Sequence, residues 1–240
     1  MLLNEIVAFL NGKKNLSNLA GMARYGISTN NAYGISMPVL RQKAKEIGTD
    51  HQLALDLFGT GIHEAKILAA LVDVPSQVHQ RQMENWLKGF DSWDVTDQVC
   101  TILFDKTVHA WKMAIKWTKR KSEYEKRAAY SIMAGLAVHD AISPDSQFKS
   151  LLPHIIHGAK DDRNYVKKAV SWAMRNIGKR SPSLNKAAIR VAEELRKSGH
   201  KSSRWIGADA FRELTSPAVK EKIESQSETK RGHSTHERRS

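Results

Sequence analysis

Apolar residues recur at helical spacing in five stretches of the chain, whereas the alternating pattern of strands joined by hairpin turns is missing. The stretches are EAKILAALVD, WDVTDQVCTILF, KRAAYSIMAGLAVHD, YVKKAVSWAMRNIGK and RWIGADAFREL, at residues 64–73, 93–104, 126–140, 165–179 and 204–214. Short breaks containing Gly, Pro, Ser or Asp separate them. The pattern predicts an all-α chain with short connections.

The five stretches also resemble one another and recur at a regular interval. Their equivalent first-turn positions lie 31, 30, 41 and 36 residues apart and are Lys66, Asp97, Arg127, Lys168 and Arg204. This interval is typical of helical hairpins that stack into an α-solenoid, each pair burying its apolar side against the next. We predict such a solenoid, in which the second helix of each pair lines a concave groove; a non-repetitive helical bundle is the alternative.

The chain is strongly basic, with a formal net charge of +13 and a pI near 9.8. The C-terminal segment 225–240 is polar, poor in apolar residues and predicted to be disordered. Its four basic and two acidic residues give it a net charge of +2, which leaves +11 on residues 1–224, the predicted single repeat domain. A positive potential of this size favours polyanionic partners such as nucleic acid.

The rest of the composition limits where the protein works. Cys100 is the only cysteine, so no disulfide can form within the chain, as is common in a reducing cytoplasm. Because Cys100 lacks the charged neighbours that activate a thiolate, we expect it to pack rather than react. Residues 1–15 indicate an amphipathic helix rather than a signal peptide, and no apolar run reaches the roughly 20 residues of a membrane span. We expect a cytoplasmic protein that makes no membrane contact.

One predicted helix carries a stripe of cations around an aromatic ring, formed by Lys168, Trp172, Arg175 and Lys179. These residues fall at i, i+4, i+7 and i+11, while the core side of the helix carries Val166, Val170, Ala173 and Ile177. Cations bind phosphate oxygens, and a ring packs on deoxyribose or on a base. The predicted DNA contacts are therefore Lys168, Arg175 and Lys179 of this stripe, together with Lys66 and Arg127 of other repeats. The alternative places Trp172 in the core and leaves the cations as solvated surface.

Trp93 and Asp97 lie four residues apart and therefore share one face of a predicted helix. A carboxylate is awkward to bury beside an indole, and in a groove built for DNA the phosphates repel it. An acid among basic equivalents therefore costs binding unless something positive must be recognised. Two candidates are an alkylated purine that carries a positive charge and the oxocarbenium-like sugar that forms when such a base leaves.

The size of this effect is sufficient for catalysis. A carboxylate about 4 Å from a unit positive charge stabilises it by about 4 kcal/mol at an effective dielectric constant near 20. Acting on the transition state, this corresponds to roughly a thousandfold in rate. The alternative is structural: Asp97 caps its helix or pairs with Arg127 or Lys66.

Five motifs are spread over residues 1–215: MARY at 22–25, YGISMPVLR at 33–41, SWDVTD at 92–97, KRAA at 126–129 and VKKAVSWAMR at 166–175. In combination they resemble the bacterial DNA alkylation repair enzymes of the AlkD-like type, which are monofunctional DNA glycosylases built from HEAT-like helical repeats. The functional positions of that family fall on residues of the same type in this chain, namely Tyr25, Trp93, Asp97, Arg127 and Trp172.

The resemblance implies a role for each of these positions. Duplex DNA that contains alkylated purines would lie in the basic concave face, with Tyr25, Trp93 and Trp172 cradling the damaged nucleotide. Asp97 would stabilise the sugar cation and position water, and Arg127 would hold a neighbouring phosphate. The family is described as needing no pocket for an extruded base, because a cationic alkylpurine is already a good leaving group. We expect the protein to act as a monomer.

Other chemistries find little support in the sequence. His154 and His157 have HxxH spacing without a third ligand or a general base, and no Gly-rich phosphate loop follows a strand, so we expect no metal and no cofactor. Two functions remain. One is a DNA glycosylase that hydrolyses the N-glycosidic bond of N3- and N7-alkylated purines; the other is a non-catalytic helical-repeat binder of DNA or of an acidic protein, which would not need Asp97.

Overall fold

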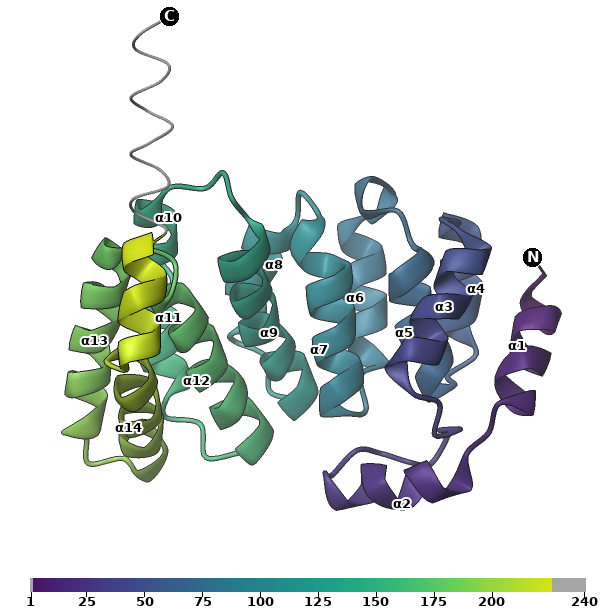
Figure 1. Cartoon of the computed structure of the whole chain (residues 1–240), viewed down its shortest axis with the longest axis horizontal. Helices are drawn as coiled ribbons and strands as arrows, with labels where there is room; N and C mark the ends of the chain where they lie inside the picture. The colour runs from purple at the N-terminus through teal and green to yellow at the C-terminus, as the bar shows by residue number, and fades with distance from the viewer. Residues whose placement is uncertain (1, 226–240) are drawn as a thin grey trace, which may run out of the picture. The chain divides into compact units, whose positions relative to one another are not determined.

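The computed structural model describes residues 2–225, and Figure 1 follows its helices in chain order. The chain divides into two compact units, residues 1–128 (the first unit) and residues 129–240 (the second unit). Every regular element within residues 2–225 is helical, which confirms the prediction of an all-α chain. The prediction of one repeat domain over residues 1–224 stays a prediction, and the segment 226–240 of the predicted disordered tail lies outside the described residues.

The first unit contains the helices α1 (Leu3–Gly12), α2 (Leu16–Arg24), α3 (Met37–Ile47), α4 (His51–Gly59), α5 (His63–Val72), η1 (Pro75–Gln77), α6 (Gln80–Lys88), α7 (Trp93–Ile102), η2 (Phe104–Lys106) and α8 (Ala110–Trp117). The helix α9 (Glu123–His139) runs from the first unit into the second. The second unit continues with α10 (Asp145–Lys149), α11 (Leu152–Gly158), α12 (Asn164–Gly178), α13 (Pro182–Arg196) and α14 (Lys201–Leu214), followed by a helical segment at 217–225.

The five stretches predicted from the apolar pattern are the helices α5, α7, α9, α12 and α14. Each follows another helix after a short connection, as the repeat interval predicts. Within the first unit α5 packs against α4 and α7, and within the second unit α14 packs against α12 and α13. The successive second helices of neighbouring pairs are therefore in contact in each unit, which is the packing expected of stacked hairpins.

The core of the first unit contains a chain of aromatic rings. Phe58 of α4 stacks on Trp86 of α6, with ring centroids 4.2 Å apart and planes 4° from parallel. Trp86 in turn contacts Phe104, and Phe104 contacts Trp117 at the end of α8. Aromatic side chains bury about 150–250 Å² each, so these contacts join the hairpins of the unit into one core. Ile6 and Leu10 are fully buried on α1, which confirms the amphipathic helix predicted at the N-terminus.

The core of the second unit depends on a close approach between α13 and α14. A Cβ atom on Gly207 would lie 2.6 Å from the carbonyl oxygen of Ala192 and 2.7 Å from the backbone nitrogen of Arg196. Only glycine therefore allows α14 to come this near to α13. The predicted core positions Val166, Val170, Ala173 and Ile177 of α12 are all fully buried, so the predicted orientation of this helix is confirmed.

Two further predictions bear on function. Cys100 is completely buried on α7, and this burial raises the pKa of its thiol well above the ordinary value, which supports packing over reactivity. No helix within residues 2–225 is long and apolar enough to cross a membrane.

Candidate nucleic-acid interface

Asp97 and Arg127 form a two-pronged ion pair within the first unit. The Nε and NH2 groups of Arg127 on α9 donate hydrogen bonds to the two carboxylate oxygens of Asp97 on α7, at 2.9 and 2.6 Å. The Arg127 side chain is 6% exposed and that of Asp97 is 15% exposed. The alternative in which Asp97 pairs with Arg127 is therefore the arrangement in the structure. A carboxylate can accept about four hydrogen bonds, so this fork does not by itself exhaust its acceptors.

Trp93 begins α7 and joins Tyr25 to this pair. Its indole N–H donates to the backbone carbonyl of Tyr25 at 3.0 Å, and the Arg127 guanidinium lies 5.6 Å from the centre of the Trp93 ring. Tyr25 directly follows the last residue of α2, and its side chain is exposed. The structure thus brings together four of the five positions identified by the resemblance. They meet because α7 and α9 are second helices of successive hairpins, and because the indole reaches the end of α2.

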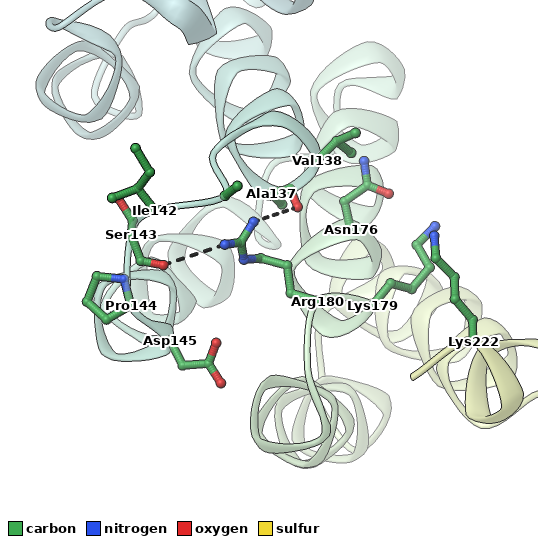
Figure 2. A pocket seen from close by; sticks show the side chains of 11 residues that line it. Ala137, Val138, Ile142, Ser143, Pro144, Asp145, Asn176, Lys179, Arg180 and Lys222 are labelled. Atoms are coloured by element: carbon green, nitrogen blue, oxygen red, sulfur yellow. Dashed lines mark hydrogen bonds between the residues drawn. The ribbon is translucent and has the colours of Figure 1, made fainter. Parts of the chain in front are cut away.

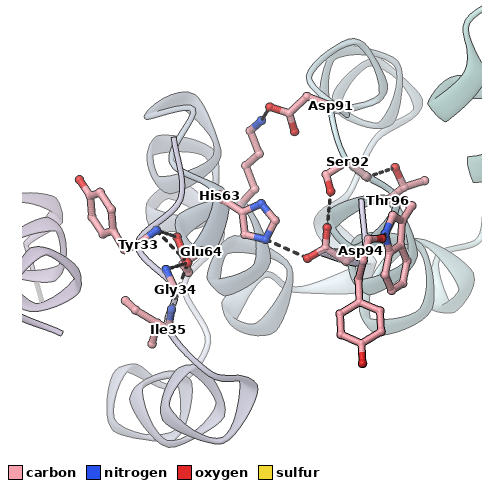
Figure 3. A network of polar contacts seen from close by, with 12 residues as sticks. Tyr33, Gly34, Ile35, His63, Glu64, Asp91, Ser92, Asp94 and Thr96 are labelled. Carbon is pink, nitrogen blue, oxygen red and sulfur yellow. Dashed lines mark hydrogen bonds and ion pairs between the residues drawn. The ribbon is translucent and has the colours of Figure 1, made fainter. Parts of the chain in front are cut away.

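A buried polar network holds the start of α7 (Figure 3). The Nε2 atom of His63 on α5 lies 2.9 Å from a carboxylate oxygen of Asp94, and the hydroxyl of Ser92 donates to the other oxygen. The hydroxyl of Thr96 donates to the Ser92 carbonyl at 2.7 Å. These contacts fix the first turn of α7, which carries Trp93, against the preceding hairpin.

The charges in this network stabilise each other. Burial by itself lowers the pKa of His63, but the hydrogen bond and charge of Asp94, together with the charges of Glu64 and Asp91, outweigh burial and raise the pKa above its ordinary value of 6.5. Burial by itself raises the pKa of Asp94, but the hydrogen bond and charge of His63, together with the hydrogen bonds from Ser92 and the backbone of Val95, outweigh burial and hold the pKa below its ordinary value of 3.8. The two groups therefore favour the ion pair over a neutral contact.

Lys66 occupies a different environment from the one predicted. Its ammonium donates to the Gly89 carbonyl at 2.9 Å and to Asp91 at 3.0 Å, and its side chain is 6% exposed. The residue that pairs with Lys66 is thus Asp91 rather than Asp97. A phosphate contact by Lys66 stays a prediction, and its burial favours a role in fixing the turn between α6 and α7.

The predicted stripe of the second unit lies along α12. Lys168 is exposed, Trp172 is half-buried, and the two remaining cations contact α14. Arg175 donates to the carboxylate of Glu213 and lies 3.5 Å from Asp209, while the Lys179 ammonium lies 2.8 Å from Glu213. Two cations of the stripe are therefore partly neutralised by neighbouring acids. Their contacts with phosphate, and that of Lys168, stay predictions.

The partners of these residues were not predicted from the sequence, although the repeat spacing indicates which residues meet on adjacent helices. His63 and Asp94 are 31 residues apart, and Arg175 and Glu213 are 38 residues apart, close to the steps between equivalent helices. A second missed feature is an exposed ring on α14, where the Lys167 ammonium lies 4.8 Å from the centre of the Trp205 ring. Among the described residues, no cluster of three or more His, Cys, Asp or Glu side chains is placed to hold a metal ion.

Two solved structures are compared with the chain, and the first of them supports the fold. The chain is similar to a protein described as one of a new family related to the HEAT-like repeat DNA glycosylases with affinity for branched DNA structures, with a TM-score of 0.72, 18% sequence identity, and 88% of this chain and 95% of that chain covered. A designed armadillo repeat protein in complex with the peptide (KR)4 matches with a TM-score of 0.41 and 13% identity, covering 89% of this chain and 91% of that chain.

Comparison of sequences identifies the family. A search of curated proteins found no matching sequence. The sequence model of the DNA alkylation repair enzymes matches residues 6–214, which cover most of both units and include all five motifs quoted above. The resemblance to the AlkD-like repeat proteins is thereby confirmed. The chain belongs to the DNA alkylation repair enzyme family.

Proposed function

We propose that this protein excises cationic N3- and N7-alkylated purines from duplex DNA by hydrolysing the N-glycosidic bond. The observation that carries the proposal is the position of the Asp97 carboxylate, which Arg127 holds by both oxygens in the turn of α7 that follows Trp93. A fixed carboxylate beside an indole is suited to a sugar that becomes positively charged, because the charge is stabilised without rearrangement of the protein.

The charge balance of the reaction fits this arrangement. The alkylated purine is a cation, so it leaves as a neutral base and takes the bonding electrons with it. The positive charge passes to the deoxyribose, where the Asp97 carboxylate stabilises it. Water then adds its oxygen to C1′ and releases a proton to solvent. No group on the enzyme has to protonate the leaving base.

The Arg127 guanidinium reduces the effect of Asp97 without cancelling it. A carboxylate about 4 Å from the sugar cation contributes about 4 kcal/mol at an effective dielectric constant near 20, and a guanidinium about 7 Å away offsets about 2 kcal/mol. The remaining stabilisation of about 2 kcal/mol corresponds to roughly thirtyfold in rate. In return the fork fixes the direction of the carboxylate, which raises the fraction of encounters that have the correct geometry.

The other predicted contacts serve binding in this proposal. Trp93 and Trp172 offer aromatic surface for deoxyribose, and the exposed Lys168 offers a cation for phosphate. The ion pair of Asp97 with Arg127 has no net charge, so it costs less repulsion from phosphates than a lone carboxylate would. The partner is duplex DNA that contains alkylated purines, bound by a monomer.

A second candidate function is binding of DNA without excision. The observation that favours it is the burial of Arg127, since a carboxylate held on both oxygens by a buried guanidinium is also what a purely structural ion pair requires. The solved structure similar to this chain is described as having affinity for branched DNA structures. A binder of this kind would keep the basic repeats and need no chemistry at Asp97.

Incubation of the purified protein with methylated duplex DNA distinguishes the two functions. Free 7-methylguanine and 3-methyladenine are measured by chromatography, and binding to intact duplex, to duplex with an abasic-site mimic and to a four-way junction is measured in parallel. Release of free base above the spontaneous rate supports the glycosylase. Tighter binding to the junction than to duplex, without release of base, supports the second function.

A further inference from the structure

A cavity of about 690 Å³ opens in the second unit, on residues that the proposed excision does not use apart from Lys179 (Figure 2). Its walls come from the end of α9, the turn that leads to α10, the end of α12 and the helical segment at 217–225. Residues 137–145 and the helical segment at 217–225, which are far apart in the chain, thus line the same concave surface.

Two exposed aliphatic residues line the cavity. Val138 is 62% exposed and Ile142 is 95% exposed, and both line the cavity. Single exposed aliphatic residues are common, but two at one concavity form a site that an apolar side chain can cover. The turn holds Ile142 outward, because the Asp140 carboxylate accepts hydrogen bonds from the backbone N–H groups of Ile142 and Ser143 at 3.0 and 2.8 Å.

Three cations, Arg180, Lys179 and Lys222, also line the cavity. Arg180 is fixed by hydrogen bonds to the carbonyl of Ala137 at 3.2 Å and to that of Ser143 at 3.5 Å, and its guanidinium stacks 3.9 Å from the centre of the Phe148 ring. Lys179 is paired with Glu213, whereas the described residues include no ion pair of Lys222.

We propose that this cavity docks an acidic segment of a partner protein that carries one aliphatic or aromatic side chain. The apolar side chain covers Val138 and Ile142, while the carboxylates of the segment face Lys222 and Arg180. The lining also contains the carboxylate of Asp145, which accepts a hydrogen bond from the Ser181 hydroxyl. A DNA backbone has no donor for a carboxylate and no side chain for exposed aliphatic residues, whereas a peptide has both.

Selection from a display library of random dodecapeptides on the full-length protein tests this inference. We expect enriched peptides to combine several Asp or Glu residues with one large apolar residue, and to bind with affinity that falls as salt is raised. Ile142→Ser and Lys222→Glu should each lower the affinity of the protein for the enriched peptides by about tenfold or more. Because both side chains are on the surface, the melting temperature should not change.

A matched pair of variants controls for general loss of charge and apolar surface. Val108 is 90% exposed and Lys106 is exposed, both in the first unit, so Val108→Ser and Lys106→Glu make the same chemical changes outside the cavity. These variants should bind the enriched peptides as the wild type does. The inference is overturned by enriched peptides that lack acidic residues or by an absence of enrichment. It is equally overturned when the two control variants lose as much affinity for the peptides as the two cavity variants. It is also overturned when Ile142→Ser and Lys222→Glu lower the affinity for duplex DNA as much as the affinity for the peptides.

Discussion

The Arg127 guanidinium binds both carboxylate oxygens of Asp97, at 2.9 and 2.6 Å, across a separation of 30 residues in the chain. This contact resolves the difficulty of an acid among basic equivalents, because the two residues together carry no net charge. It also gives Asp97 two separable roles. As a partner of a buried cation it contributes to the stability of the first unit, and as a fixed carboxylate it is the group that we propose acts on the sugar.

The stability role predicts a large effect of removing Arg127. Arg127→Ala leaves a carboxylate without its partner in a site that is largely shielded from water, and we expect a loss of about 3–5 kcal/mol in the free energy of unfolding. Arg120→Ala is the control. The side chain of Arg120 is about one-third exposed, so its ion pairs with Glu84 and Glu125 should contribute less than about 1 kcal/mol to the free energy of unfolding. Urea denaturation of the two variants measures both values. Equal losses of unfolding free energy in Arg127→Ala and Arg120→Ala would show that the Asp97 carboxylate tolerates the absence of Arg127.

Salt dependence separates the exposed cations from the buried ones. Lys168 is exposed, so Lys168→Ala should flatten the slope of log affinity against log salt for duplex DNA by about 0.9. Lys66 was predicted to bind DNA from its place in the basic row, but its ammonium is held by Gly89 and Asp91. Lys66→Ala should therefore leave the slope unchanged at temperatures where the variant is folded. The same flattening in both variants would place Lys66 on the DNA surface after all.

The pair of His63 and Asp94 predicts a defined pH dependence of stability. Because the pKa of His63 is raised above 6.5 in the folded state, its stabilising effect is complete below about pH 6.5 and is lost as the pH rises through the raised pKa. Because the pKa of Asp94 is lowered below 3.8, its effect is complete above that value and is lost as the pH falls through the lowered pKa. The pair therefore contributes most between about pH 4 and pH 6.5.

Unfolding measurements on His63→Gln check this dependence. Glutamine can still donate to Asp94 but does not titrate, so the stability difference between the wild type and the variant should shrink as the pH rises from about 6 to 9. The Asp94→Asn variant should give the same trend, since it removes the other half of the pair. A difference that stays constant over this range would mean that His63 is not charged in the folded protein.

Helical periodicity was sufficient to predict the elements that carry the site. The i, i+4 spacing of Trp93 and Asp97 put them on one face of α7, and the 30-residue step put Arg127 one repeat away. Periodicity gives the face of a helix, but not which neighbour its side chain reaches. Lys66 and Arg127 were both possible partners of Asp97. The turn at Gly89 and Asp91 takes Lys66, and this depends on a backbone path that apolar spacing does not encode.

The burial of charged groups was harder to predict than the helices. Arg175 and Lys179 were predicted to contact DNA from an exposed stripe, yet both contact Glu213 on the next second helix. The pairs of His63 with Asp94 and of Arg127 with Asp97 follow the same rule, in which oppositely charged residues about one repeat step apart meet across adjacent helices. Applying that rule to the sequence would have identified all four pairs. It would not have identified the cavity near Ile142, because a turn sets that geometry.

Single-turnover excision of 7-methylguanine from duplex DNA by Asp97→Asn, at saturating protein, tests the central claim most directly. Glu84→Gln is the matched control, since Glu84 is also a partly buried carboxylate held by cations, Lys116 and Arg120, within the first unit. Both variants should lose stability and remain folded at a temperature set from their melting curves. Because Asp97→Asn loses the whole carboxylate contribution and keeps the opposing charge of Arg127, we expect it to excise about a hundredfold or more slowly, beyond the roughly thirtyfold net effect of the intact pair. We expect it to bind duplex DNA as tightly as the wild type or more tightly, while Glu84→Gln excises at the wild-type rate. An unaltered excision rate in Asp97→Asn would remove this carboxylate from the mechanism and leave it only as the structural partner of Arg127.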